Sequence, residues 1–418
     1  MVKKMLTKAL RLHGANDLRL DAFELSLPDD GILASVVSDS LCMSTRKALI
    51  QGSAHKRVPD DLDFDPVIVG HELCGVIEEV GALWKEHYKP GEKFTLQPAR
   101  AGVFAAPGYS YSYCGGDATK IVIPRELIES GCLLKYSGEG FFCGSLSEPV
   151  SCVLAALRSS FHTNGRIHEM GIKDRGKVLL LGGAGAMGLC MIDCIVHSDR
   201  RPSLLAVVDT DPLKLSRAAR LLPPARAEKL GTRLIYLNPA NFGDPDESLK
   251  RFAGGFYDDA FVFAPVKELV ETADSLLGED GCLNFFAGPT DSGFGARLNF
   301  YNVHYSSRHV VGTSGGDAED MREALRLIET GAINPAIMIT HICGLDSAAE
   351  ATRHLDRLPG AKKLCYTNIS LPLTALDDLE RLGRNDSLYA GLGEIVGKNG
   401  GLWSLEAENY LLKYARSI

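Results

Sequence analysis

The segment from Lys177 to Ile195 restricts the possible folds of this chain more than any other stretch. Four apolar residues, Val178 to Leu181, have the pattern of a short buried strand, and a glycine-rich run over 182–188 follows at once. Apolar residues then recur at helical spacing from Leu189 onward. A strand, a tight glycine turn and a helix in this order predict a βα unit of a doubly wound parallel sheet.

The glycine-rich run reads G-x-G-x-x-G and predicts a dinucleotide site. Gly183 is expected to permit the tight turn, Gly185 to let the backbone approach a pyrophosphate, and Gly188 to allow close packing of the helix. The amino-terminal end of that helix favours an anionic ligand. Ala186 and Met187 complete the predicted cofactor loop.

A second apolar strand, 204–208, ends in Asp209, an acid about 20 residues beyond the glycine run, as the dinucleotide pattern requires. Its carboxylate would accept hydrogen bonds from the adenosine ribose and repel a 2′-phosphate. The sequence therefore favours NAD(H) over NADP(H), although Arg217 and Arg220 nearby weaken the exclusion of NADP.

Three further cofactor contacts are predicted from position alone. Strand patterns at 258–263, 281–287 and 310–315 continue the parallel sheet, and ligands bind at the carboxyl ends of such strands. The residues at these ends are Ala264, Ala287 and Thr313.

A different kind of site is indicated near the amino-terminal end, where residues 1 to about 150 consist of short β-patterns separated by turns. His71 and Glu72 directly follow one apolar run, and Cys42 follows another. Cysteine, histidine and a carboxylate can hold zinc and leave one position open for water or substrate. The alternative is an exposed His-Glu pair beside a buried structural cysteine.

The spacing around this pair resembles the zinc motif of the medium-chain alcohol and polyol dehydrogenases. Gly70, Gly75 and Gly81 stand at the family's positions around His71-Glu72. Further family-like stretches follow in the family's order, and the match covers roughly residues 5 to 370. They are Cys42-Met43-Ser44, Lys89 to Phe94, Ser147-Glu148-Pro149 and the glycine loop.

The resemblance implies an α/β protein with a GroES-like β-rich catalytic domain and a Rossmann cofactor domain. The expected boundaries are 1–155 for the catalytic domain, 156–316 for the cofactor domain, and 317–418 for a return to the catalytic domain with a helical carboxyl-terminal extension. Within that extension, Thr374 and Gly383 are expected to start and stop one helix, and Ser404 to cap another.

The resemblance also assigns roles to site residues. It implies a catalytic zinc held by Cys42, His71 and Glu72, with a glutamate as third ligand as in sorbitol dehydrogenases. Ser44 matches the family's proton-relay hydroxyl, or else it only caps a turn. Glu148 is either an alternative zinc ligand or a carboxylate beside the ligands. Lys214 stands where NAD-using relatives place a ribose contact, although alone it would pass for a solvated lysine.

Two departures from the family pattern matter. Many relatives carry four cysteines for a structural zinc in the region between Leu96 and Gly116, but this chain has only Cys114 there. One thiolate cannot complete a tetrahedral site, so one catalytic zinc and no structural zinc are expected. Thr45 and Lys47 also replace a common aspartate and a relay histidine.

The basic pair Arg46 and Lys47 lies close behind the first ligand, and such cations suit a substrate phosphate. The missing cysteine lobe, the stretch 113–119 and the folded carboxyl-terminal tail together resemble the L-sorbose 1-phosphate reductase branch of the family. The expected activity is zinc-dependent hydride transfer between NAD(H) and a sugar alcohol or ketose, such as a ketose phosphate. The alternatives are an enzyme of an unphosphorylated polyol or another small alcohol, and a catalytically silent nucleotide-binding sensor.

Composition limits the remaining partners. A formal net charge of −8 over 418 residues argues against a nucleic-acid or membrane-surface binder, and no apolar run is expected to span a bilayer. The 11 cysteines include no C-x-x-C pair, which favours a reducing cytoplasm. A homo-oligomer, dimer or tetramer, is expected by family analogy only.

Overall fold

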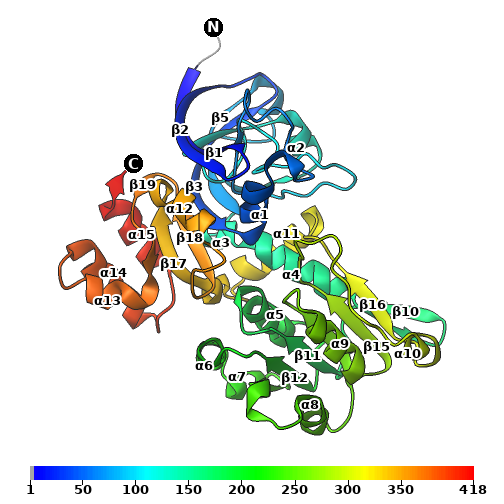
Figure 1. The fold of residues 1–418 in the computed structure, drawn as a ribbon. Helices are drawn as coiled ribbons and strands as arrows, with labels where there is room; N and C mark the ends of the chain where they lie inside the picture. The colour runs from blue at the N-terminus through cyan, green and yellow to red at the C-terminus, as the bar shows by residue number, and fades with distance from the viewer. Residues whose placement is uncertain (1–3) are drawn as a thin grey trace. The chain divides into compact units, whose positions relative to one another are not determined.

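The computed structural model describes residues 4–418 and divides them into two compact units (Figure 1). The first unit contains the chain up to Pro149, Asp317–Gly331 and Ile339–Ile418, and the second contains Val150–Gly316 and Ala332–Met338. Residues 332–338 thus pack with the second unit, where the backbone N–H of Asn334 donates to Asp193. The functional domain boundaries drawn from the sequence stay a prediction.

The second unit is built on a parallel six-stranded sheet in the order β13-β12-β11-β14-β15-β16. This order is that of a doubly wound dinucleotide-binding sheet, which confirms the predicted fold class. The strands are β11 (Lys177–Leu181), β12 (Leu204–Val208), β13 (Arg233–Leu237), β14 (Tyr257–Val262), β15 (Leu277–Phe285) and β16 (His309–Gly312), with a separate hairpin of β9 (Phe161–Asn164) and β10 (Ile167–Met170).

Helices connect the strands of this sheet, as the alternating sequence patterns predict. The central strands β11 and β12 are almost wholly buried, which explains their continuous apolar runs. The helices are α5 (Ala186–His197), α6 (Pro212–Leu221), α7 (Pro224–Lys229), α8 (Pro245–Ala253), α9 (Lys267–Leu276) and α10 (Phe300–Tyr305).

The first unit is β-rich and centres on strand β3 (Ile32–Leu41), which pairs with β5, β7 and β18 of an eight-stranded sheet. A smaller sheet has the order β2-β1-β4. The other strands are β1 (Lys4–Gly14), β2 (Asp17–Ser26), β4 (Val67–Ile68), β5 (Leu73–Val80), β6 (Lys93–Leu96), β7 (Lys120–Ile123), β8 (Leu133–Lys135), β17 (Ile339–Gly344), β18 (Lys362–Tyr366), β19 (Ile369–Ser370), β20 (Thr374–Ala375) and β21 (Arg416–Ser417).

The helices of the first unit are mostly short. They are α1 (Met43–Gln51), α2 (Arg125–Glu129), α3 (Phe141–Ser145), α11 (Ala318–Glu329), α12 (Leu345–Arg353), α13 (Leu379–Leu382), α14 (Ser387–Lys398) and α15 (Leu405–Tyr414), and α4 (Ser147–Ser159) runs from the first unit into the second.

The carboxyl-terminal extension is folded and belongs to the first unit (Figure 1). Gly383 is the C-cap of α13 and Ser404 caps α15 by accepting from the N–H of Ala407, as expected. Thr374 does not start a helix, because it lies in the short strand β20 that pairs with β17.

One expectation about hydropathy needs correction. The window Phe141–Ser159 is long and apolar enough to span a bilayer by length and composition, with a mean hydropathy of 1.2. It comprises α3 and α4, and 61% of it is buried inside the protein. Core helices of soluble proteins pass the same test, so this window is weak evidence for a membrane span.

Candidate functional site

The register of β3 and β5 brings the three proposed metal ligands together. In this antiparallel pair Asp39 lies opposite Leu73, so the end of β3 adjoins the start of β5. Cys42 is the N-cap of α1 directly after β3, and Glu72 immediately precedes β5. The turn before His71 requires glycine, because Gly70 has a φ of +87° and a Cβ there would lie 2.5 Å from the backbone nitrogen of Asp117.

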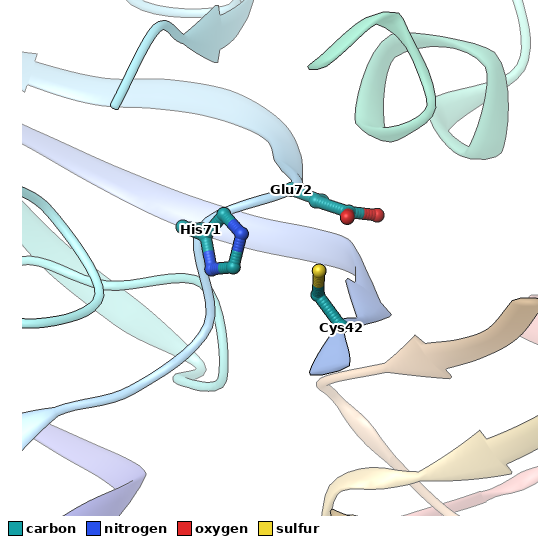
Figure 2. A group of neighbouring side chains, drawn as sticks. All are labelled: Cys42, His71 and Glu72. Atoms are coloured by element: carbon teal, nitrogen blue, oxygen red, sulfur yellow. The ribbon is translucent and has the colours of Figure 1, made fainter. Parts of the chain in front are cut away.

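The ligand atoms of Cys42, His71 and Glu72 all lie within 4.8 Å of one another (Figure 2). Within residues 4–418 they form the only group of three or more such side chains with this proximity. His71 and Glu72 are buried and Cys42 is partly buried. A thiolate, an imidazole and a carboxylate at this spacing make a donor set that suits zinc and leaves a fourth position open.

One hydroxyl group lies near each ring nitrogen of His71. Thr45 Oγ1 lies 3.3 Å from Nδ1, and Tyr109 Oη lies 3.4 Å from Nε2. Burial lowers the pKa of His71 to about 4, so the ring is neutral at physiological pH and offers a lone pair to a metal. Thr45, which stands where an aspartate is frequent in the family, thus contacts this ring.

The environment of Cys42 and Glu72 fits a bound cation. Burial raises the pKa of the Cys42 thiol to about 12, so a positive charge is needed to hold the thiolate at neutral pH. Lys362 Nζ donates a hydrogen bond to Oε1 of Glu72, whereas Oε2 is buried and has no hydrogen-bond partner. An orphaned buried carboxylate oxygen close to a thiol and an imidazole is an arrangement that a metal would satisfy.

Ser44 and Glu148 both lie near this ligand group. The Cys42 thiol donates to Ser44 Oγ at 3.6 Å. Glu148 is buried in the first turn of α4. Burial is the main cause of the raised pKa of Cys42, and the negative charge of Glu148 raises it further. Glu148 is not a member of the ligand group of Cys42, His71 and Glu72. This position favours a carboxylate beside the ligands, and the role of each residue stays a prediction.

The basic residues proposed for a phosphate occupy different surroundings. Arg46 forms an ion pair with Asp356 at 2.9 Å and donates to the carbonyl of Arg353, so its guanidinium is engaged within the protein. Lys47 lies in α1, where its charge acts on His55. A third cation, Arg57, lies with its guanidinium 5.4 Å from the ring centre of Tyr109.

The predicted cofactor loop forms the turn between β11 and α5. The left-handed residue of this turn is Gly182, with a φ of +70°. Gly183 must lack a side chain because a Cβ would lie 2.7 Å from Leu180 Cβ. Gly188 packs against the loop, where its Cβ would lie 2.0 Å from the carbonyl oxygen of Gly183. A Cβ on Gly185, the N-cap of α5, would meet open space, so a ligand can approach this backbone.

The remaining cofactor candidates lie at the carboxyl ends of the same sheet. Asp209 follows β12 and accepts the backbone N–H of Ala184 at 3.2 Å, which holds its carboxylate at the glycine loop. Ala186 and Met187 begin α5, and Lys214 is exposed in the first turn of α6. Ala264, Ala287 and Thr313 follow β14, β15 and β16, and the buried Thr313 Oγ1 has no hydrogen-bond partner.

Sequence reasoning missed Lys362 and Tyr109. Lys362 is 290 positions from Glu72, and only the pairing of β18 with β3 brings it to the site. Tyr109 lies in an irregular loop rich in tyrosine, and its position beside His71 has no local sequence signal. Two buried aspartates, Asp39 and Asp117, were also missed, and burial raises the pKa of Asp117 to about 7.

Cys114 is fully buried in the core of the first unit, packed with residues such as Ile68 and Ala118. The expectation of a single zinc stays a prediction that metal analysis must test.

A two-unit protein with a doubly wound dinucleotide-type sheet and a Cys-His-Glu ligand group has the architecture of the metal-dependent medium-chain dehydrogenases. Solved structures share this fold. The 2R,3R-butanediol dehydrogenase from Bacillus subtilis superposes with a TM-score of 0.70 at 22% identity, over 87% of this chain and 100% of that one. A putative zinc-binding dehydrogenase from Sinorhizobium meliloti 1021, bound to NADP, gives 0.68 at 20% identity, over 87% and 99%.

Curated relatives match nearly the whole chain. An uncharacterized protein of Escherichia coli (strain K12), YggP, is 47% identical over 98% of this chain and 97% of its own length. Mannitol-1-phosphate 5-dehydrogenase of Aliivibrio fischeri is 45% identical over 98% of each chain, and L-sorbose 1-phosphate reductase of Klebsiella pneumoniae is 44% identical over 99% and 98%. No protein-family model matches. The chain belongs to the zinc-dependent medium-chain dehydrogenase/reductase family.

Proposed function

We propose that this protein is a zinc-dependent oxidoreductase that transfers a hydride between a nicotinamide cofactor and a sugar phosphate, with a ketose phosphate and its polyol phosphate as the substrate pair. The observation that carries the proposal is the proximity of Cys42, His71 and Glu72, together with the buried Glu72 oxygen that has no hydrogen-bond partner. Relatives named for mannitol 1-phosphate and L-sorbose 1-phosphate, each above 40% identical over almost the full chain, support the phosphorylated substrate.

Cys42, His71 and Glu72 would hold one zinc, which when bound supplies a Lewis acid for the substrate oxygen. The nicotinamide supplies the hydride chemistry. The chain's own residues position these groups: Thr45 orients His71 through Nδ1, and Lys362 keeps Glu72 in place.

Proton movement falls to the hydroxyls beside the ligands. Burial holds the pKa of the Tyr109 phenol well above its usual value, although a hydrogen bond with Ser44 opposes that shift. Tyr109 is therefore a neutral phenol at physiological pH, and Ser44 and Tyr109 form a pair of hydroxyls next to the thiol and the imidazole. We propose this pair as the start of a proton path. It would take over the role of the relay histidine that is common in the family at the position of Lys47.

The proposed activity can be tested by following NADH oxidation with L-sorbose 1-phosphate and with L-sorbose, and NAD⁺ reduction with mannitol 1-phosphate and with mannitol. We expect the phosphorylated member of at least one pair to have the higher kcat/KM. A preference for the free sugars would point to an unphosphorylated polyol, and zinc-loaded protein without turnover on any of them would point to another small alcohol as substrate. Protein that binds NADH but neither zinc nor these substrates would point to a nucleotide-binding sensor.

The preference for NAD(H) over NADP(H) is also a proposal and rests on Asp209. Its carboxylate lies at the glycine loop, where a 2′-phosphate would meet a like charge. We expect Asp209→Gly to raise kcat/KM for NADPH relative to NADH by about tenfold or more, since about 1.4 kcal/mol of repulsion corresponds to a factor of ten. Asp211→Asn, which removes the charge of a nearby carboxylate at the N-cap of α6, serves as the control. Wild-type protein that already prefers NADPH would contradict this assignment.

Three finer expectations are kept as proposals. Zinc binding and substrate recognition are assigned to residues 1–155 and 317–418, and cofactor binding to 156–316. A homo-oligomer, dimer or tetramer, is proposed by family analogy. A reducing, cytoplasmic location is proposed because all eleven cysteines are free thiols.

A further inference from the structure

We propose that Arg57 binds the phosphate group of the substrate and that Tyr109 fixes the distance between this cation and the metal ligands. The inference rests on the proposed function, because it assumes a phosphorylated substrate at the Cys42-His71-Glu72 group. It replaces Arg46, which the sequence suggested for this task and which the structure pairs with Asp356.

Arg57 is held next to the ligand group through contacts with a single ring. Its guanidinium carbon lies 5.4 Å from the ring centre of Tyr109, and the hydroxyl of the same ring lies 3.4 Å from Nε2 of His71. The imidazole of His55 stacks on this ring at 5.5 Å with an angle of 8°. Tyr109 therefore acts as a rigid spacer with a metal ligand at its hydroxyl end and a cation over its face.

The backbone around Arg57 is also fixed. Its carbonyl accepts a hydrogen bond from Ser110 Oγ at 2.6 Å, and its N–H donates to Nδ1 of His55 at 3.3 Å. Because the neighbouring residue Ser110 is covalently joined to Tyr109, the main chain of Arg57 and the spacer ring are tied to each other. Less conformational freedom is then lost when the guanidinium binds an anion.

Arg57 has the free binding capacity that Arg46 lacks. In the described chain Arg46 has a carboxylate partner at 2.9 Å, whereas Arg57 forms no ion pair with any carboxylate of residues 4–418, and its guanidinium lies over the ring of Tyr109. Arg57 is half-buried, so water screens its charge less than that of a fully exposed arginine. A planar guanidinium with open donors suits bidentate binding of a phosphate.

Other cations strengthen the positive field at this place. Burial lowers the pKa of His55, and the charges of Arg57, Lys56 and Lys47 lower it further. A sugar phosphate whose reacting oxygen lies at the ligand group would extend its phosphate several ångströms along Tyr109 towards Arg57. Such a distant charged contact can orient the reacting carbon.

The test compares Arg57→Gln with Arg46→Gln, an arginine of similar burial that already has an acidic partner. For each variant and for wild type, kcat/KM is measured with L-sorbose 1-phosphate and with L-sorbose. Binding of L-sorbose 1-phosphate is measured by calorimetry, and zinc content by elemental analysis. Arg57→Lys tests whether charge alone is sufficient.

We expect Arg57→Gln to lower kcat/KM for the phosphorylated ketose by about 10- to 100-fold and to weaken its binding similarly, while the free ketose and the zinc content are unaffected. Arg57→Lys should recover part of the loss, and Arg46→Gln should keep the preference for the phosphorylated substrate. Equal effects of Arg57→Gln on both ketoses, or loss of the preference in Arg46→Gln instead, would overturn the assignment and leave the proposed function standing. Wild-type protein without any preference for the phosphorylated ketose would overturn the proposed function itself.

Discussion

Replacement of Cys42 with alanine is expected to remove most of the bound zinc and to lower turnover by about a thousandfold or more, while NADH binding persists. The thiol is one of the three ligand atoms that lie within 4.8 Å of one another, and without it the imidazole and carboxylate alone make a weak site. A metal that stabilises developing charge contributes several kcal/mol, and each 1.36 kcal/mol is about tenfold in rate. The glycine loop that would bind the dinucleotide belongs to the other unit and is not altered.

The measurement is zinc per chain by elemental analysis, together with NADH fluorescence titration and steady-state rates. Cys132→Ala is the matched control, because Cys132 is a buried free thiol outside the ligand group. Wild-type protein should carry about one zinc per chain, and the control should retain it. A second tightly bound zinc would contradict the argument from the single cysteine in the 96–116 region, and full activity of Cys42→Ala would refute the ligand assignment.

Replacement of Glu408 with glutamine is expected to reduce the pH dependence of stability between pH 5 and pH 8. Glu408 lies in α15 of the carboxyl-terminal extension and is almost fully buried. Its carboxyl group accepts the backbone N–H groups of Phe141 and Phe142 at the start of α3, at 2.7 and 2.8 Å, and the hydroxyl of Tyr366 at 2.9 Å. The fully buried Trp403 also donates to the Tyr366 hydroxyl. These contacts fasten the extension to the helix that precedes α4 and Glu148.

Burial raises the pKa of Glu408 from 4.5 to about 7, although its three hydrogen bonds oppose the shift. Between these two pH values the unfolded chain loses the proton and the folded chain keeps it. The stability that depends on this proton is complete below about pH 4.5 and is lost as the pH rises to about 7, which amounts to roughly 3 kcal/mol.

Chemical unfolding of wild type, Glu408→Gln and the control Glu406→Gln at pH 5 and pH 8 measures this contribution. Glu406 is an exposed acid of the same helix. We expect the free energy of unfolding to fall less between the two pH values in Glu408→Gln than in wild type, and Glu406→Gln to behave like wild type. Other buried acids such as Asp117 titrate in the same range, so only the difference between the proteins is informative. An identical pH dependence in all three would contradict the assignment.

Much of the fold and part of the site follow from short stretches of sequence. The apolar run 178–181, the glycines after it and the helical spacing from Leu189 predict a βα unit, because strand burial, turn geometry and helix periodicity are each encoded within a few residues. The observed strand order confirms the doubly wound sheet. Cys42, His71 and Glu72 are likewise indicated by their positions directly after two apolar runs. The capping side chain of Ser404 predicts the start of the last helix.

The partners of these residues depended on the tertiary structure. Lys362 reaches Glu72 across 290 positions, Tyr109 reaches His71 from an irregular loop, and Glu408 caps a helix 266 positions earlier. The same packing pairs Arg46 with Asp356 in an ion pair and places the guanidinium of Arg57 over Tyr109, beside the ligand group. Local patterns determine which residues stand at the ends of strands, but strand register and loop packing determine which side chains meet there. The role of a charged residue can therefore be inferred only when the residues that contact it, which are often distant in the sequence, are known.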